Sequence, residues 1–397
     1  MRVPGLSHPE TALAGVVLVA SYLALVRWLR RRNIRNLARR YASYVEDPYS
    51  MDYKTAFEIF QNVITYEFPS TYAYATQFAL IKSYAVAHGT RLLARTSRLT
   101  SAQRVGKRAE DTVVLLSEIL VAGIDSDRGC RALSKINWLH RQYQSYITND
   151  EMIYTLALFI LEPLRWGDAV EWRKWTDLER VAIFTYWREI GHRMGMSGIP
   201  ETIPCLQRWA AEFADKHAKF ADSNVHCTTA ALNLFLRSLP AFLRGLGTQV
   251  CTCFVEEHVR PMIGLSHPHW FIAATVQNLV MIRAFLLRNF FLPRLSLYHG
   301  LGTMDKAGRV HRHIYAFEPW YVSETAWSSL KKFTPGLWPG SLPGPEFSSE
   351  GYLPEEVGPH EYVERSKRSV MREAEQMAEY ARKGGALGNG CPFAFSD

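Results

Sequence analysis

The sequence predicts an all-α protein with a single-pass N-terminal membrane helix, a helical-bundle body and an irregular C-terminal strap. Three observations predict this class: an uncharged apolar stretch near the N-terminus, helical periodicity across residues 52–291, and a Pro- and Gly-rich run over residues 334–359. Period-2 alternation and a repeating strand–helix pattern are both missing. With 397 residues, 48% of them apolar, the chain can bury a sizeable core and is not intrinsically disordered.

The first element is the apolar stretch at residues 11–26, which reads TALAGVVLVASYLALV. At about 1.5 Å per residue it spans about 24 Å, and Trp28 and Leu29 extend it toward the thickness of a bilayer core. A cleaved signal peptide is the alternative, but it needs basic residues before the apolar run, where only Arg2 stands. We therefore expect a transmembrane anchor at 11–29. The arginines that follow it place residues 1–10 across the membrane and the body in the cytosol.

The net charge of +8 comes from one short segment. Without the arginines of residues 27–40, the chain has 39 basic and 38 acidic residues. A nucleic-acid-binding domain would spread its basic residues over a folded face, so we exclude that function. We expect residues 30–50 to form a basic cytosolic linker. Six cysteines in a chain of this length are too few for a disulfide framework and indicate a reducing compartment.

The body is expected at residues 51–330 and the strap with a final helix at 331–397. Two capping-box candidates, Thr148 with Glu151 and Thr176 with Glu179, mark helix starts. The last helix is expected at about 365–383. The helices of the body are expected at about 54–66, 70–95, 102–123, 127–144, 149–165, 177–195, 203–221, 225–245 and 269–291.

His140 is the most informative histidine, because Leu133, Ile136, His140 and Tyr143 share one helical face. An imidazole among apolar neighbours can ligate a haem iron, although a core histidine with satisfied hydrogen bonds has the same spacing. His88 has a similar helical spacing and could also face the interior. Glu189-x-x-His192 is one half of a di-iron motif, but the chain has no second copy.

Arg108 and Thr112 lie one helical turn apart, with Asp111 beside them, and they precede Leu115 and Ile119. Polar groups at the head of an apolar helical face can line a pocket. An exposed helix start has the same pattern, and periodicity does not separate the two.

These residues occur in stretches that resemble the fungal ER-bound oxygenases of the MpaB type. That group belongs with the bacterial latex-clearing rubber oxygenases in one all-helical haem-b family. The similarity extends from about residue 53 to the C-terminus, and the preceding anchor has the same layout. The stretches that carry the resemblance are GKRAEDT at 106–112, INWLHRQY at 136–143, NDEMIYTLALFILEPLRW at 149–166, EWRKWTDLERVAIFTYWREIGHRMGM at 171–196 and the terminal Cys391-Pro392-Phe393.

The resemblance implies a globin-like or helical-bundle haem domain in which His140 is the axial ligand of the haem iron. It places Arg108 and Thr112 on the distal side, where Arg108 either donates hydrogen bonds to the reacting oxygen or holds a haem propionate. The latex-clearing branch has a lysine where this chain has Asp111, so the resemblance does not assign the sixth iron position, which is open, filled by water or held by another group. Asp111 is expected to orient Arg108 or to act as a base.

The resemblance further implies a haem-b oxygenase that cleaves a carbon–carbon double bond of a prenylated or terpenoid intermediate in secondary-metabolite biosynthesis. Such an enzyme would act at the cytosolic face of the ER membrane, with dioxygen and a hydrophobic small molecule as its partners and no nucleic acid. Two alternatives remain at this point. One is a di-iron oxidase or hydroxylase built on Glu189 and His192, and the other is a non-catalytic membrane adaptor.

Overall fold

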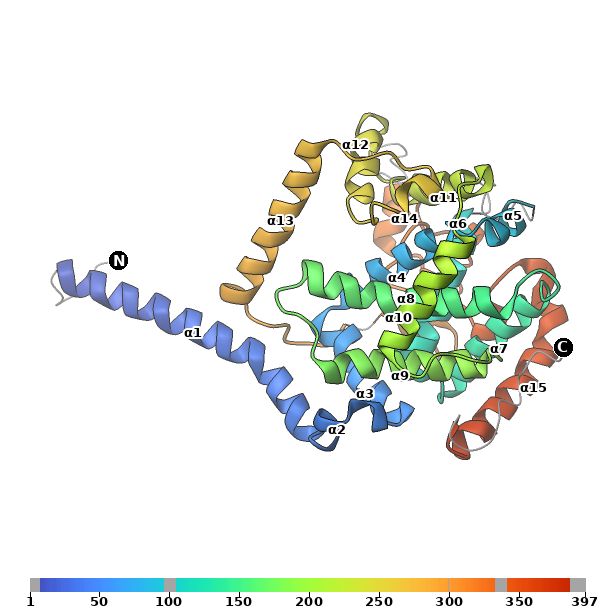
Figure 1. Cartoon of the computed structure of the whole chain (residues 1–397), viewed down its shortest axis with the longest axis horizontal. Coiled ribbons are helices and arrows are strands. Elements are labelled where there is room, and N and C mark those ends of the chain that lie inside the picture. Colours follow the sequence, from blue (N-terminus) through green and yellow to red (C-terminus); the bar gives the residue numbers. More distant parts are fainter. Residues whose placement is uncertain (1–7, 96–104, 299, 333–340, 386–397) are drawn as a thin grey trace.

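The computed structural model describes residues 8–95, 105–298, 300–332 and 341–385, and these are mostly helical (Figure 1). The only β-structure assigned to strands in these ranges is a short antiparallel pair, β1 (Thr303–Met304) with β2 (Val310–His311). The expected all-α class is confirmed. The helices are α1 (His8–Arg40), α2 (Ser43–Glu46), α3 (Tyr53–Asn62), α4 (Pro69–Ser83), α5 (Ala87–Arg95), α6 (Val105–Ser117), α7 (Asp127–Arg141), α8 (Asn149–Val170), α9 (Asp177–Arg193), α10 (Ile203–His217), α11 (Asp222–Phe235), α12 (Ala241–Thr252), α13 (Trp270–Asn289), α14 (Ala326–Lys332) and α15 (Val363–Arg382).

Helix α1 contains the apolar stretch and projects from the body of the molecule (Figure 1). Most of its apolar side chains are exposed, and Leu18, for example, is 72% accessible, whereas Val26 at the end of the stretch is buried. The helix continues without a break to Arg40. The basic residues expected in a linker are therefore helical as far as Arg40, and the apolar and basic segments form one continuous rod.

Both capping boxes predicted from the sequence form. The Thr148 hydroxyl accepts from the Glu151 backbone N–H while the Glu151 carboxylate accepts from the Thr148 backbone N–H, and Thr176 and Glu179 repeat the arrangement. These reciprocal bonds satisfy N–H groups that a helix start otherwise leaves without partners. They fix the starts of α8 and α9, the two long helices at the centre of the fold.

Two of the expected helices are divided. The helix expected at 70–95 breaks between α4 and α5, where the Ala85 carbonyl accepts a bond from the Lys219 N–H instead of one within the helix. The helix expected at 225–245 ends at Phe235, and a new helix begins after Pro240. Proline disfavours a helical conformation in the preceding residue and has no N–H to continue the helix.

The core lies where α4 packs on α8, α3 on α9 and α7 on α15. Helix α15 corresponds to the expected final helix, and it lies along α7, which carries His140. Between α14 and α15, residues 341–362 are irregular apart from single 3₁₀ turns, as the Pro and Gly content predicts. Residues 333–340 of the expected strap and Cys391 lie outside the described ranges.

Candidate active site

A cavity of about 850 Å³ lies among α4, α5, α6, α7, α8 and α9, and residues 358–361 also contribute to its wall. This volume falls within the range of about 300–1,000 Å³ that is usual for ligand and cofactor sites. Most of its wall is apolar. The main apolar residues are Leu80, Leu92, Leu93, Leu115, Leu116, Ile119, Ile136, Leu139, Met152, Phe159, Trp187 and Met194.

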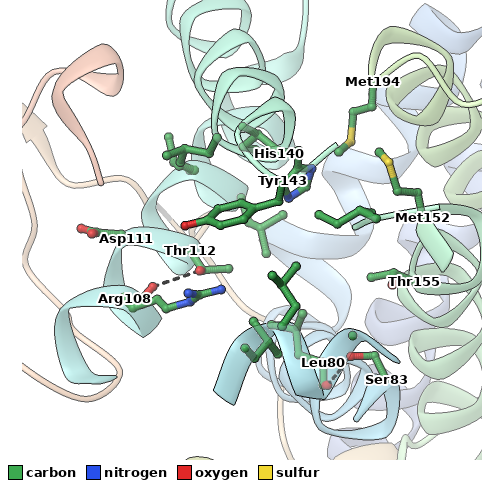
Figure 2. Close-up of a pocket in the computed structure, with 18 of the residues that line it drawn as sticks. Leu80, Ser83, Arg108, Asp111, Thr112, His140, Tyr143, Met152, Thr155 and Met194 are labelled. Carbon is green, nitrogen blue, oxygen red and sulfur yellow. Dashed lines mark hydrogen bonds between the residues drawn. The ribbon is translucent and has the colours of Figure 1, made fainter. Parts of the chain in front are cut away.

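His140 extends into this cavity from the last turn of α7 (Figure 2). Its Nδ1 atom is buried and has no hydrogen-bond partner among the described residues. Burial, and secondarily the positive charge of Arg108, lowers the pKa of His140 to about 4. The imidazole is therefore neutral at pH 7 and keeps a nitrogen lone pair for a ligand.

The helical face expected around His140 is present. Ile136, His140 and Tyr143 line the cavity, and Leu133 is fully buried one turn earlier in the core. The periodicity of this segment therefore placed Leu133, Ile136 and His140 correctly on the inward side of α7, whereas Tyr143 reaches the cavity from the turn after the helix, which ends at Arg141.

Arg108 and Thr112 line the opposite wall from α6, and the Arg108 guanidinium points into the space facing His140 (Figure 2). The Thr112 hydroxyl donates to the Arg108 backbone carbonyl over 2.9 Å. Its proton is thereby used within the helix, and only its lone pairs remain for a group in the cavity. Arg108 is therefore the stronger donor of the pair.

Asp111 lies at the edge of the cavity, with its carboxylate turned away from His140 (Figure 2). It accepts hydrogen bonds from Lys107 Nζ over 2.8 and 3.0 Å and from Tyr321 Oη over 2.7 Å. Lys107 also donates to the Gly358 carbonyl over 2.8 Å. The Lys107–Asp111 pair thus connects α6 to two separate stretches of the C-terminal region, Asp111 through Tyr321 and Lys107 through Gly358. Lys107 was foreseeable from its i,i+4 spacing to Asp111, whereas no local pattern marks Tyr321.

The other candidate residues lie elsewhere. His88, whose spacing would have allowed it to face the interior, is exposed and bonds Glu151 over 2.7 Å through Nδ1. The Glu189 carboxylate is buried against Arg193 at 2.9 Å, and His192 is not part of the cavity wall. Within the described ranges no cluster of three or more His, Cys, Asp or Glu side chains could hold a metal ion. The di-iron alternative therefore has no ligand set in this part of the chain.

Comparison with known families identifies the family of the chain. Residues 79–286, just over half of the chain, match the family described as "ER-bound oxygenase mpaB/B'/Rubber oxygenase, catalytic domain". The chain belongs to this family. The matched segment contains Arg108, Asp111, Thr112 and His140. The oxygenase is accordingly an oxidoreductase, and the resemblance seen in the sequence is confirmed.

The similarity extends over nearly the whole oxygenase. It is 26% identical to the ER-bound oxygenase mpaB' of Penicillium brevicompactum, over 95% of this chain and 93% of that protein. It is 28% identical to the ER-bound oxygenase mpaB of Penicillium roqueforti, over 64% of this chain and 90% of that protein. A second mpaB, from Penicillium brevicompactum, is 25% identical over 83% of this chain and 81% of its own length.

Proposed function

We propose that this oxygenase uses haem b, held by His140, to cleave a carbon–carbon double bond in a prenylated or terpenoid intermediate of secondary metabolism. The observation that carries the proposal is the neutral imidazole of His140, whose Nδ1 has no partner among the described residues, in a large apolar cavity. A buried polar atom without a partner is costly unless a ligand completes the site. One imidazole in the cavity, without a cluster of metal-binding side chains in the described part of the chain, suits a haem iron better than a di-iron centre.

The residues of the cavity divide into three roles. His140 would hold the iron, which when bound supplies the capacity to activate dioxygen. Arg108, on the opposite wall, would donate charge-assisted hydrogen bonds to polar groups that develop negative charge there. The apolar lining would bind the hydrocarbon part of the substrate and exclude water.

We assign Asp111 a positioning role. Both of its oxygens are occupied by Lys107, and Tyr321 adds a third bond, so a base function would first require breaking an ion pair. The same bonds hold the cavity-facing turn of α6 in place. Thr112 would orient Arg108 through its backbone bond.

We further propose that α1 anchors the oxygenase in the ER membrane, with residues 1–10 in the lumen and the body in the cytosol. The relatives are named ER-bound, and the exposed apolar stretch of α1 is followed directly by arginines. In this arrangement residues 51–330 form the oxygenase domain, and residues 331–397 complete it. An epitope placed before residue 1 should then be protected from protease in intact microsomes, while the body is digested.

The test of the cofactor is an absorption spectrum of detergent-purified full-length protein produced with a haem precursor. We expect a Soret band and near-stoichiometric haem b by pyridine haemochrome. His140→Ala should lose the haem with helix content unchanged, and His192→Ala should retain it. Added imidazole should restore haem binding to His140→Gly, because it refills the space of the missing ring. Haem retained in His140→Ala would overturn the ligand assignment.

A further inference from the structure

Helix α13 is apolar on nearly all sides but lies on the surface of the protein. It is long enough and apolar enough to cross a membrane, and Asn289 is its only buried residue. Trp270, Phe271 and Phe285 are 73%, 60% and 59% exposed. The chain that follows continues this surface. The remaining exposed apolar residues of α13 and of residues 290–297 are Leu279, Met281, Ile282, Leu286, Phe290, Phe291, Leu292, Leu295 and Leu297.

A surface of this kind needs a covering partner, because single exposed apolar residues are common but a continuous apolar helix and loop are not. A helix that is apolar on all sides is normally buried in a core or in lipid. In the oxygenase α13 is not in the core, so a lipid phase or another protein must cover it.

Both ends of α13 are tied to the same folded body. Before the helix, Val259 and Ile263 are buried in an apolar cluster with Trp166. After it, the Tyr298 N–H donates to the Thr65 carbonyl over 2.7 Å. A helix that crossed a bilayer would place its two ends on opposite sides, so α13 cannot span the membrane in this fold.

The side of α13 that faces the body is also fixed. Arg283 donates to the Val170 carbonyl over 3.1 Å, and Arg288 donates to the Trp172 carbonyl over 2.6 and 2.9 Å. The two arginines, the charged residues of this helix, are thus satisfied by protein. Lipid contact on the outer side therefore leaves neither of them without a partner.

The C-terminal end of α13 meets α1 at a defined depth. Tyr22 Oη donates to the Phe290 carbonyl over 2.8 Å, and Arg27 donates to Asn289 Oδ1 over 2.8 and 3.0 Å. Arg30 donates to the carbonyls of the next residues, at 291 and 292. This is the level at which the apolar stretch of α1 ends and its arginines begin, which corresponds to the surface of a bilayer. From this junction α13 diverges from α1 instead of running beside it (Figure 1).

The charge at the junction fits lipid headgroups. Arg32 and Arg294, both exposed, line a cavity of about 430 Å³ together with Leu29 and Leu295. Cationic groups beside apolar ones, at the level where a membrane helix leaves the bilayer, match the phosphates and upper acyl chains of anionic phospholipids.

We infer that α13 and residues 290–297 lie in the cytosolic leaflet of the membrane, parallel to its plane, as a second attachment beside α1. The occupant of the exposed apolar surface is the bilayer itself. This inference rests on the membrane attachment of α1 proposed above and adds that the body is held at two points, so that it cannot swing freely on α1.

The test is photo-crosslinking of the full-length protein in liposomes of phosphatidylcholine and phosphatidylserine. Three single variants carry p-benzoylphenylalanine: Leu18→p-benzoylphenylalanine in α1, Phe285→p-benzoylphenylalanine in α13 and Phe220→p-benzoylphenylalanine as the matched control. Phe220 is an aromatic residue outside α1 and α13 that is 62% exposed, close to the 59% of Phe285. Adducts are identified by mass spectrometry after irradiation.

We expect phospholipid adducts at residues 18 and 285, each in several-fold higher yield than at residue 220. An adduct at residue 18 without one at residue 285 overturns the inference for α13 and leaves the anchor intact. Crosslinks from residue 285 to a second copy of the chain, in place of lipid, assign the surface to a dimer and also overturn it. Lipid adducts in equal yield at residues 220 and 285 would show that the contact is not specific to α13. A missing adduct at residue 18 contradicts the anchor of the proposed function.

Discussion

For His140, the sequence predicts the direction of the side chain, and the structure adds the surroundings that favour a ligand role. The spacing of α7 predicts that it faces inward, but spacing alone does not distinguish a ligand from an ordinary core histidine. The structure adds a neighbouring cavity and a buried Nδ1 atom with no partner among the described residues. Both depend on α4, α6 and α8, which are distant in sequence, and for this reason the spacing could not reveal them.

If His140 holds haem as proposed, the pH dependence of haem binding follows from the lowered pKa of this histidine. In the folded protein the pKa is about 4 and in the unfolded chain it is near 6.5, so the native imidazole stays unprotonated as the pH falls between these values. The stability that this site contributes is present above pH 6.5 and declines as the pH falls toward 4. We expect the Soret band to persist at pH 5.5 and to be lost near pH 4.

Absorbance and far-UV circular dichroism recorded together from pH 8 to pH 3.5 check this expectation. If haem were released with a midpoint near pH 6.5 while the helix content stayed constant, the imidazole would be titrating as an exposed histidine does. That result would contradict the burial of His140.

Substitutions at Arg108 can separate its two expected roles, which are donation of hydrogen bonds into the cavity and binding of a haem propionate. If it donates hydrogen bonds into the cavity, Arg108→Gln should retain haem but bind cyanide at least about tenfold more weakly, because a charge-assisted hydrogen bond contributes about 1.5–3 kcal/mol. The cyanide affinity of Arg108→Lys should lie between that of the unsubstituted protein and that of Arg108→Gln, because lysine keeps the positive charge but lacks the planar guanidinium group. Absorption spectra of the haem-loaded variants measure how much haem is retained, and titration with cyanide measures the cyanide affinity. A lower haem occupancy in Arg108→Gln, with unchanged cyanide affinity of the haem that remains bound, would instead assign Arg108 to a haem propionate.

Individual elements were predictable where their determinants are local. Capping boxes at Thr148 and Thr176 identified the starts of α8 and α9, because the residues that satisfy the helix start lie within four positions of one another. The break after Ser83 was missed because its cause is a bond from Lys219, far along the chain. The break before Pro240 had a local signal in the proline itself, which periodicity over the longer window obscured.

Helix α6 illustrates an element with two functions. Arg108 and Thr112 face the cavity, and the buried Glu110 binds Arg312 and accepts from the Glu318 N–H over 3.0 Å. Glu110→Gln should lower the free energy of unfolding by at least about 2 kcal/mol, because it removes one partner of a buried ion pair. Hydrogen exchange over residues 310–322 should rise in the same variant.

Glu58→Gln is the matched control for that substitution. Glu58 pairs with Arg40 on the surface, where both side chains are more than half exposed, and such pairs contribute about 1 kcal/mol or less. Chemical denaturation of both variants makes the comparison. If both variants lowered the free energy of unfolding equally, the Glu110 ion pair would not be what holds residues 312–318 against α6.

At the scale of the whole molecule, the sequence indicated an anchored all-α protein and gave few of the contacts that assemble it. These contacts join distant segments: Lys135 of α7 donates to Ser366 of α15 over 2.6 Å and to the Glu355 carbonyl over 3.0 Å. Because no local pattern encodes such pairs, the C-terminal region was predicted as a strap and a helix without its place against α7. The exposure of α13 could likewise not be predicted from periodicity, because periodicity indicates a helix but not which part of the protein packs against it.

Arg193 is the centre of this long-range assembly and provides its most direct test. Its fully buried guanidinium bonds Glu189 at 2.9 Å, Asp125 at 2.7 Å and the Ile124 carbonyl at 2.9 Å, and lies over the rings of Tyr53 and Tyr380. It therefore connects α9 with α3, α15 and the loop before α7. Arg193→Met should lower the free energy of unfolding by about 3–5 kcal/mol, because it removes the cation that pairs with the buried Glu189 carboxylate and with Asp125.

Arg188→Met, on the same helix, should cost about 1 kcal/mol or less, since its 3.9 Å pairing with Glu201 lies at the surface. The double variant Glu189→Gln with Arg193→Met should recover part of the loss, because one of the two carboxylate charges that faced the arginine is removed together with it. Chemical denaturation of the full-length protein in detergent gives the free energy of unfolding of Arg193→Met, Arg188→Met and the double variant. If Arg193→Met were no more destabilising than Arg188→Met, the Arg193 ion pairs would not contribute measurably to holding α3, α9 and α15 together.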